Sequence, residues 1–214
     1  MKETILNIRR GITDNCSRQL IINENLISFE DKDIVNDTFT TFNKDEIIAY
    51  RFGIKWTTFY FTFGREYQIF IKNKLGKEIK ISFKTYLGNK KHDYHSKYQE
   101  ILDSLWDNFF LDIINSCIDK HNNGEDFQIE NVLFTRDYIS LKVDKLLKQK
   151  EIKILWNDIR TKNYHTYFSI YSIINPTDIN RAFNYLDDWN TGIIYSVLRT
   201  ILRDKNIESY HSNQ

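Results

Sequence analysis

The feature of this chain that most constrains its fold is a β-hairpin pattern that occurs twice, 112 residues apart and without a gap. Residues 20–29 read LIINENLISF, and residues 132–141 read VLFTRDYISL. In each segment a short polar turn separates two apolar runs, which is typical of an antiparallel hairpin. At the same spacing Ile47 corresponds to Ile159. Hairpins also resemble one another by chance, but a match that continues beyond the hairpin predicts a duplicated unit.

Each hairpin begins a block of strands that is followed by one helix. In the first block the pattern predicts strands at 47–52, 56–63, 67–71 and 78–83, a polar loop at 31–46 and a break at Gly64-Arg65-Glu66. Residues 78–83 alternate polar and apolar side chains, the mark of a half-buried strand. Helical spacing then begins near residue 94, continues to about 120 in two apolar stripes, and stops before Gly124.

The second block repeats this order in fewer residues. Strands are predicted at 132–134, 138–143, 152–156, 164–174 and 182–186. The apolar residues from Trp189 to Leu202 have helical spacing, and Asp187 or Asp188 is a candidate cap for the start of this helix. We therefore expect an α+β chain of two antiparallel, strand-rich units, a first domain at 1–122, a second, shorter domain at 123–204, and a polar tail at 205–214.

A strand-rich unit closed by one helix resembles the pleckstrin-homology-like superfold, including its GRAM and bacterial variants. The similar features are the opening hairpin, Trp156-Asn157-Asp158-Ile159 at the entry to a strand, and the helices that carry Trp106 and Trp189. The resemblance implies a bent antiparallel barrel or sandwich plugged by a C-terminal amphipathic helix. In that superfold phosphoinositides bind to Lys and Arg near the first hairpin turn. The turns here are Asn23-Glu24-Asn25 and Thr135-Arg136-Asp137, which lack paired basic residues, so a protein partner is favoured.

Composition and charge exclude several classes of protein. Apolar residues make up 41% of the chain, which is enough for a core, and the 30 Lys and Arg nearly balance the 29 Asp and Glu. A balanced chain has no overall field that attracts nucleic acid. The apolar runs are too short to cross a membrane, and Cys16 and Cys117 have no metal or redox spacing. We expect a cytoplasmic protein without a cofactor or a bound metal.

A lysine-rich stretch at 72–97 is the first candidate binding feature. It predicts contact with an anionic surface, nucleic acid or an acidic partner, and the alternative is an outward face that lysines keep soluble and that protects a sheet edge. The candidate residues are Lys72, Lys74, Lys77, Lys80, Lys84, Lys90 and Lys91.

The densest aromatic cluster of the chain, at 56–63, is the second candidate. Alternation along a strand predicts Phe59, Phe61 and Phe63 in the core, with Trp56 and Tyr60 as the candidates for a partner contact.

Catalytic motifs are few. Glu78-Ile79-Lys80 and Glu151-Ile152-Lys153, with an upstream Asp137 or Asp144, have the spacing of a Mg²⁺-dependent nuclease, although ordinary alternation on an exposed strand gives the same pattern. The chain has no nucleophile elbow, phosphate-binding loop or dinucleotide fingerprint.

The leading expectation is a non-catalytic module that binds a protein. Recruitment to anionic membranes and nuclease activity are the alternatives.

Overall fold

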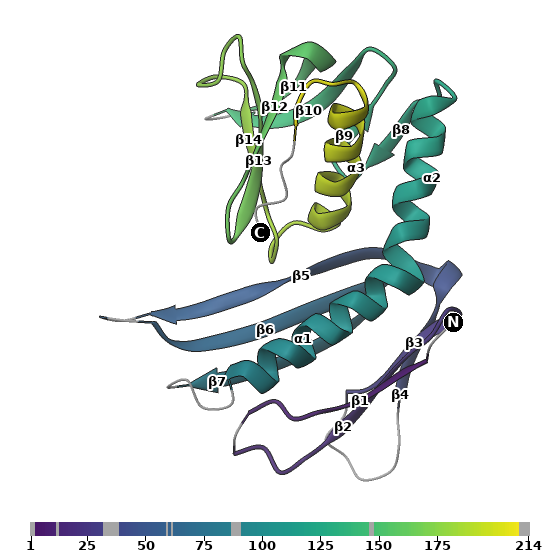
Figure 1. The fold of residues 1–214 in the computed structure, drawn as a ribbon, viewed down its shortest axis with the longest axis vertical. Helices are drawn as coiled ribbons and strands as arrows, with labels where there is room; N and C mark the ends of the chain where they lie inside the picture. The colour runs from purple at the N-terminus through teal and green to yellow at the C-terminus, as the bar shows by residue number, and fades with distance from the viewer. Residues whose placement is uncertain are drawn as a thin grey trace. The chain divides into compact units, whose positions relative to one another are not determined.

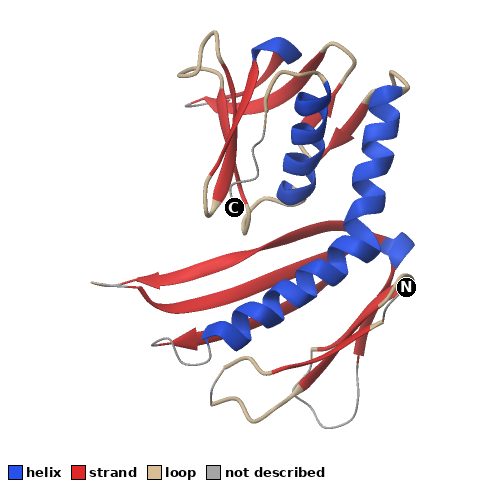
Figure 2. Cartoon of the chain, viewed as in Figure 1, coloured by secondary structure: helices blue, strands red, loops and turns tan. Residues whose placement is uncertain are grey.

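The structure is a computed structural model of the chain, and it describes residues 3–11, 13–31, 39–58, 60, 62–86, 91–145 and 148–209. The chain divides into two compact units, Met1–Leu111 and Asp112–Gln214 (Figure 1). Both units are rich in antiparallel strands and each carries helix, so the expected α+β class is confirmed (Figure 2).

Unit 1 contains two antiparallel sheets and a helix. The first sheet has the order β1-β2-β3-β4 and the second the order β5-β6-β7. The elements are β1 (Thr4–Ile8), β2 (Arg18–Ile22), β3 (Leu26–Glu30), β4 (Phe39–Asn43), the 3₁₀ turn η1 (Lys44–Glu46), β5 (Ile47–Thr58), β6 (Thr62–Asn73), β7 (Glu78–Tyr86), α1 (Lys91–Leu105) and the π-helix η2 (Trp106–Phe110).

Unit 2 has the same order of elements in shorter form. Its sheets have the orders β11-β10-β9-β8 and β12-β13-β14. Its elements are α2 (Leu111–Asn122), whose first residue still belongs to unit 1, β8 (Phe127–Ile129), β9 (Val132–Phe134), β10 (Tyr138–Lys145), β11 (Lys148–Leu155), the 3₁₀ turn η3 (Trp156–Asp158), β12 (Ile159–Asn163), β13 (Tyr167–Ser172), β14 (Asn180–Asn184) and α3 (Thr191–Asp204).

In the described residues each unit therefore contains four strands, a 3₁₀ turn, three strands and a following helix in this order, and α2 precedes the series in unit 2. The pairings among the described strands form four separate sheets, and no closed barrel is found among them.

The turns of the two hairpins, 112 residues apart, are held by hydrogen bonds of the same kind. In the first hairpin the Asn23 N–H donates to the Leu26 carbonyl, and the Leu26 N–H donates to Asn23 Oδ1 at 3.1 Å. In the second hairpin the Thr135 N–H donates to the Tyr138 carbonyl, and the Tyr138 N–H donates to Thr135 Oγ1 at 3.1 Å. The side chains at positions 23 and 135 thus hold the two turns in the same way.

The corners that follow the four-stranded sheets also correspond. The first residue of η1, Lys44, donates its N–H to the Asn25 carbonyl, and the first residue of η3, Trp156, donates its N–H to the Asp137 carbonyl. Each turn passes directly into the next strand, β5 or β12.

Alternation along β7 determines which face of the second sheet in unit 1 is buried. Ile79, Ile81 and Phe83 point inward and are buried, as the period-two pattern predicted. Helix α1 covers this face, with the ring of Tyr98 5.1 Å from that of Tyr67 and the ring of Tyr94 5.7 Å from that of Phe83. The opposite face of the sheet carries Glu78, Lys80, Ser82 and Lys84 of β7.

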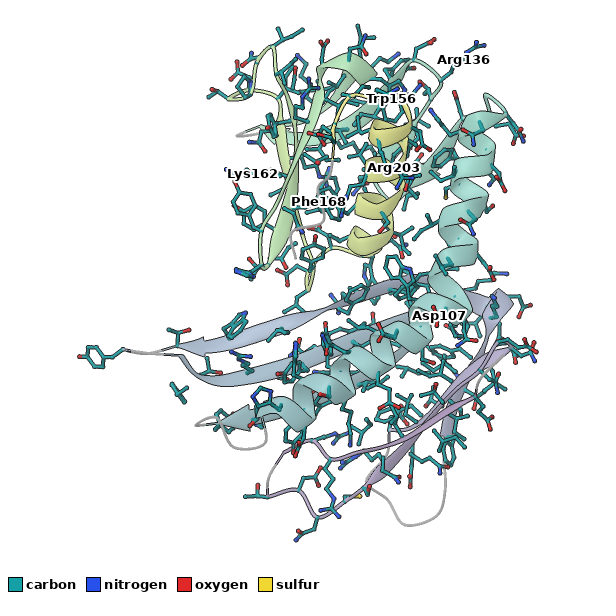
Figure 3. All side chains as sticks on the ribbon, in the orientation of Figure 1. Asp107, Arg136, Trp156, Lys162, Phe168 and Arg203 are labelled. Carbon is teal, nitrogen blue, oxygen red and sulfur yellow. The ribbon has the colours of Figure 1, made fainter. Side chains whose placement is uncertain are left out.

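Trp156 is central to the core of unit 2 (Figure 3). Its indole N–H donates to the Thr135 carbonyl at 3.1 Å, and its ring meets the His121 ring edge-on at 5.2 Å. Burial, together with the ammonium group of Lys205, lowers the pKa of His121.

The long helix contains an interruption that its periodicity did not predict. Residues 106–110 form a π-helix, in which the Leu111 N–H donates to the Trp106 carbonyl, five residues back. The helix ends as expected, because Gly124 has a φ of 75° and donates its N–H to the His121 carbonyl.

The two compact units divide within this helix, between Leu111 and Asp112. The contact of His121 with Trp156 gives the reason, because it joins the last turn of α2 to unit 2. An apolar stripe along a helix does not reveal which unit covers each turn.

Several strand predictions were wrong. Residues 39–43, expected in a loop, form β4, which pairs with β3 although Phe42 is its one buried residue. The expected break at Gly64-Arg65-Glu66 lies inside β6, and the chain instead reverses between Thr58 and Thr62. Strands β1 and β8 were not predicted because they are short, with five and three residues, and each is paired by the strand that follows it.

The last helix begins later than predicted. Neither Asp187 nor Asp188 is its cap, because α3 starts at Thr191 after Asn190, which has a positive φ of 56°. The Asp188 carboxylate instead accepts the Asn184 N–H at 2.7 Å. Beyond the helix, both carboxylate oxygens of Glu208 accept hydrogen bonds from Thr161 at 2.8 Å, so the expected polar tail is fastened to β12 at this point.

Candidate binding surface

The outward face of β5–β6–β7 brings together some of the predicted lysines. The register pairs Lys72 with Glu78, Phe70 with Lys80 and Glu66 with Lys84. Because these residues alternate with the buried ones, they share the face that α1 does not cover. We call Arg51, Phe70, Lys72, Glu78, Lys80 and Lys84 the outer face.

A phenylalanine lies between two cations at the centre of the outer face. The Arg51 guanidinium is 4.3 Å from the centre of the Phe70 ring, and the Lys80 ammonium is 5.4 Å from it. Cations over a ring are attracted by its quadrupole, and their apolar stems shield it from water. Glu78 lies 3.8 Å from both Arg51 and Lys72 and neutralises part of this charge.

The other predicted lysines lie elsewhere. Lys74 and Lys77 are exposed at the turn between β6 and β7. Lys91 is the first residue of α1, its side chain lies outside the described part of the structure, and Lys90 lies outside the described residues altogether. The lysine-rich stretch therefore spreads over a turn, a sheet face and a helix start.

The far end of the same sheet displays the two predicted aromatic contact residues. Tyr60, in the turn between β5 and β6, is 89% exposed, and Trp56 is 37% exposed. The Arg65 guanidinium lies 4.3 Å from the centre of the Trp56 ring on the paired strand. Tyr86, at the end of β7, is also exposed. We call Trp56, Tyr60, Arg65 and Tyr86 the hairpin arm.

Two of the phenylalanines that were expected in the core beside them, Phe59 and Phe61, lie outside the described residues. The third, Phe63, is half-buried and its ring is 6.3 Å from that of Tyr86.

Unit 2 shows that the hairpin arm exceeds what the core needs. Strands β5 and β6 have 12 residues each, whereas their counterparts β12 and β13 have 5 and 6. The last four residues of β5 are all exposed. The additional length buries little apolar surface, so stability of the fold does not account for it.

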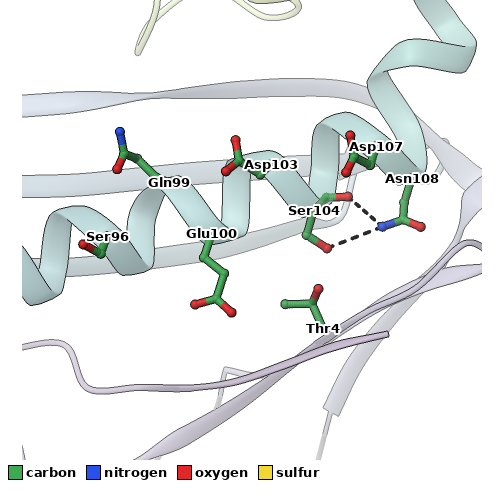
Figure 4. A pocket seen from close by; sticks show the side chains of 8 residues that line it. All are labelled: Thr4, Ser96, Gln99, Glu100, Asp103, Ser104, Asp107 and Asn108. Carbon is green, nitrogen blue, oxygen red and sulfur yellow. Dashed lines mark hydrogen bonds between the residues drawn. The ribbon is translucent and has the colours of Figure 1, made fainter. Parts of the chain in front are cut away.

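A polar groove of about 460 Å³ lies between β1 and the outer side of α1 (Figure 4). Three exposed carboxylates, those of Glu100, Asp103 and Asp107, line it at intervals of about one helical turn. At its end the Asn108 side chain, 6% exposed, donates to the carbonyl of Ser104 at 2.8 Å. The remaining lining residues are Thr4, Ser96 and Gln99. We call this feature the acidic groove.

The carboxylates of the predicted nuclease motifs are engaged elsewhere. Glu78 faces Arg51 and Lys72, and Glu151, in the other unit, accepts the Ser140 hydroxyl at 2.7 Å. The structure does not describe the Asp144 side chain. Across the described residues, no three His, Cys, Asp or Glu side chains are grouped so that they would hold a metal ion.

Sequence reasoning missed Arg51, Arg65 and the acidic groove. The two arginines become partners of Phe70 and Trp56 only through strand pairing, which has no local signal. The spacing of Glu100, Asp103 and Asp107 was readable as one helix face, but the strand that completes the groove was not predicted.

No family model matches the chain, and no curated protein or solved structure matches it. None of the helices in the described part of the chain combines the length and the apolar character that crossing a membrane requires.

Proposed function

We propose that this protein is a non-catalytic binding module that holds a protein partner through the hairpin arm. The observation that supports this most is the exposed Tyr60 at the end of a sheet that extends beyond its core and that also carries Trp56, with the Arg65 guanidinium over its ring. Tyrosine, tryptophan and arginine are the side chains that most often dominate protein interfaces. Stacking orders both Trp56 and Arg65 before a partner arrives, which lowers the entropic cost of binding.

Charge on the arm favours a protein over a lipid surface. Lys55 and Lys84 are paired with Glu66 across the strands, and the Glu66 carboxylate also accepts a hydrogen bond from the Ser82 hydroxyl at 3.3 Å. A partner with charges of both signs can match this pattern, whereas anionic headgroups would face the carboxylate. Membrane recruitment is the alternative that the experiment must separate.

The architecture supports a tandem pleckstrin-homology-like arrangement as part of the same proposal. Both units have the order of four strands, three strands and a helix, and both hairpin turns are held in the same way. Cys16 and Cys117 are both free thiols, in keeping with a module that works in the cytoplasm.

A photo-crosslinking amino acid at position 60, in cells of the source organism, tests the proposal. We expect a discrete crosslink to a protein that is lost when Trp56→Ala is added. The matched control places the same probe at Leu75, which is 79% exposed at the opposite end of the sheet. With the partner identified, Trp56→Ala and Tyr60→Ala should each weaken binding by about tenfold or more.

Sedimentation with lipid vesicles is the second test. The purified protein should not sediment with vesicles of phosphatidylserine and phosphatidylcholine. Sedimentation that depends on Tyr60 and Lys84 and disappears at high salt would replace the proposal with membrane recruitment. Equal crosslinking from positions 60 and 75 would also contradict it.

A further inference from the structure

We propose that copies of this chain associate head to tail, with the outer face of one copy docked on the acidic groove of the next. The contact uses neither Trp56 nor Tyr60, although Lys84 of the outer face lies near the hairpin arm, with its ammonium 5.7 Å from the centre of the Tyr86 ring.

The outer face has an excess of positive charge. Arg51, Lys55, Lys72, Lys80 and Lys84 share this face with two carboxylates, those of Glu66 and Glu78. Lys80 and Lys84 are exposed, and Phe70 lies beneath the cations as an apolar centre. A buried apolar centre with a charged rim is the usual organisation of a protein interface.

The acidic groove of a second copy has the matching charge. The side chains that line it include three carboxylates and no Lys or Arg. Its volume of about 460 Å³ is enough to admit the ends of lysine side chains. The hydrogen bond from Asn108 to Ser104 fixes the end of the groove, so the groove exists before a partner binds.

The charge of the whole chain permits this contact. The formal net charge is only +1, so two copies do not repel each other at long range. The cations and the carboxylates are separated onto different surfaces of the same unit.

The position of the two surfaces determines the kind of assembly. Helix α1 packs on the buried face of the sheet through Tyr94 and Tyr98, and the outer face is the opposite one. Two different surfaces in contact make a heterologous interface, which forms rings or open chains and not a closed twofold dimer.

Sedimentation velocity with the full chain tests this inference. From about 5 to about 200 µM protein we expect the average mass to rise with concentration in about 25 mM NaCl and to fall back in about 500 mM NaCl. Lys80→Glu with Lys84→Glu, and separately Asp103→Lys with Asp107→Lys, should each weaken association by about tenfold or more. Circular dichroism confirms that each variant is folded.

Mixing the two charge-reversed variants is the decisive measurement. In the mixture every unlike pair has complementary surfaces, so association should return, although each variant alone associates only weakly. The matched controls carry the same changes of charge elsewhere, Lys74→Glu with Lys77→Glu and Glu125→Lys with Asp126→Lys, and should associate like the original chain.

A chain that stays monomeric in low salt at every concentration would overturn the inference, as would a mixture that fails to associate. Controls that weaken association as much as the test variants would also overturn it. A Trp56→Ala, Tyr60→Ala variant should associate normally, so failure of this contact and failure of the proposed partner contact are distinguishable.

Discussion

At the scale of single residues, a few polar contacts fix segments that have little apolar surface of their own. Arg18 is almost fully buried, and its guanidinium donates to the Asp14 carboxylate at 2.7 Å. The Arg10 and Cys16 N–H groups also donate to this carboxylate, at 2.8 and 3.0 Å. Asp14 therefore organises the segment that joins β1 to β2.

The charge of Asp14 makes part of the stability depend on pH. The hydrogen bond from Arg18, with those from Arg10 and Cys16, lowers the pKa of Asp14 to about 2. Because the pKa is lower in the folded state than in the unfolded state, this stabilisation is complete above about pH 4 and is lost as the pH falls towards 2.

We predict that Asp14→Asn lowers the free energy of unfolding by about 1–2 kcal/mol at pH 7 and flattens the loss of stability between about pH 4 and pH 2. Urea denaturation across this range measures both effects. Asp126→Asn, at an exposed position, is the control. An unchanged pH profile in Asp14→Asn would show that the Arg18 contact contributes nothing.

At the scale of elements, close packing at the end of β7 fixes the hairpin arm. A Cβ at Gly64 would lie 2.7 Å from Tyr86 Cδ1 and 3.2 Å from Thr57 Cβ. Tyr86 therefore crosses directly over the glycine, and the absence of a side chain there brings the ring onto β6. Glycine at this position lets the Tyr86 ring approach the backbone of β6 closely.

We predict that Gly64→Ala lowers the free energy of unfolding by about 1–3 kcal/mol, because the Tyr86 ring must move away. Urea denaturation measures this loss. In a Tyr86→Ala background the same change should cost much less. The control is Gly11→Ala, whose Cβ would meet Lys84 Cγ at 3.8 Å, an ordinary contact. Equal losses at both glycines would contradict the packing argument.

At the scale of the whole molecule, one helix serves two cores. Its first part, α1, packs on the second sheet of unit 1, and its last turn meets Trp156 of unit 2 through His121. The π-helix η2 lies directly before the division between Leu111 and Asp112. The two parts of the helix should therefore respond to different mutations.

We predict that Trp156→Ala destabilises unit 2 by about 3–5 kcal/mol and speeds hydrogen exchange in residues 112–122 but not in residues 91–105. Tyr98→Ala, in the core of unit 1, is the matched control and should reverse this pattern. Hydrogen exchange read by mass spectrometry separates the two segments. Acceleration along the whole helix in either variant would show that the helix is a single cooperative element.

The sequence by itself determined those features of the fold that depend on interactions between neighbouring residues. The polar turns at 23–25 and 135–137, the alternation of β7 and the stop at Gly124 each depend on neighbouring residues, so their patterns are visible in the chain. Tertiary structure alone decided which lysines share a face, that Arg65 covers Trp56, and that α2 contacts Trp156. Those features depend on strand register and on contacts between distant segments, and no local preference encodes either one.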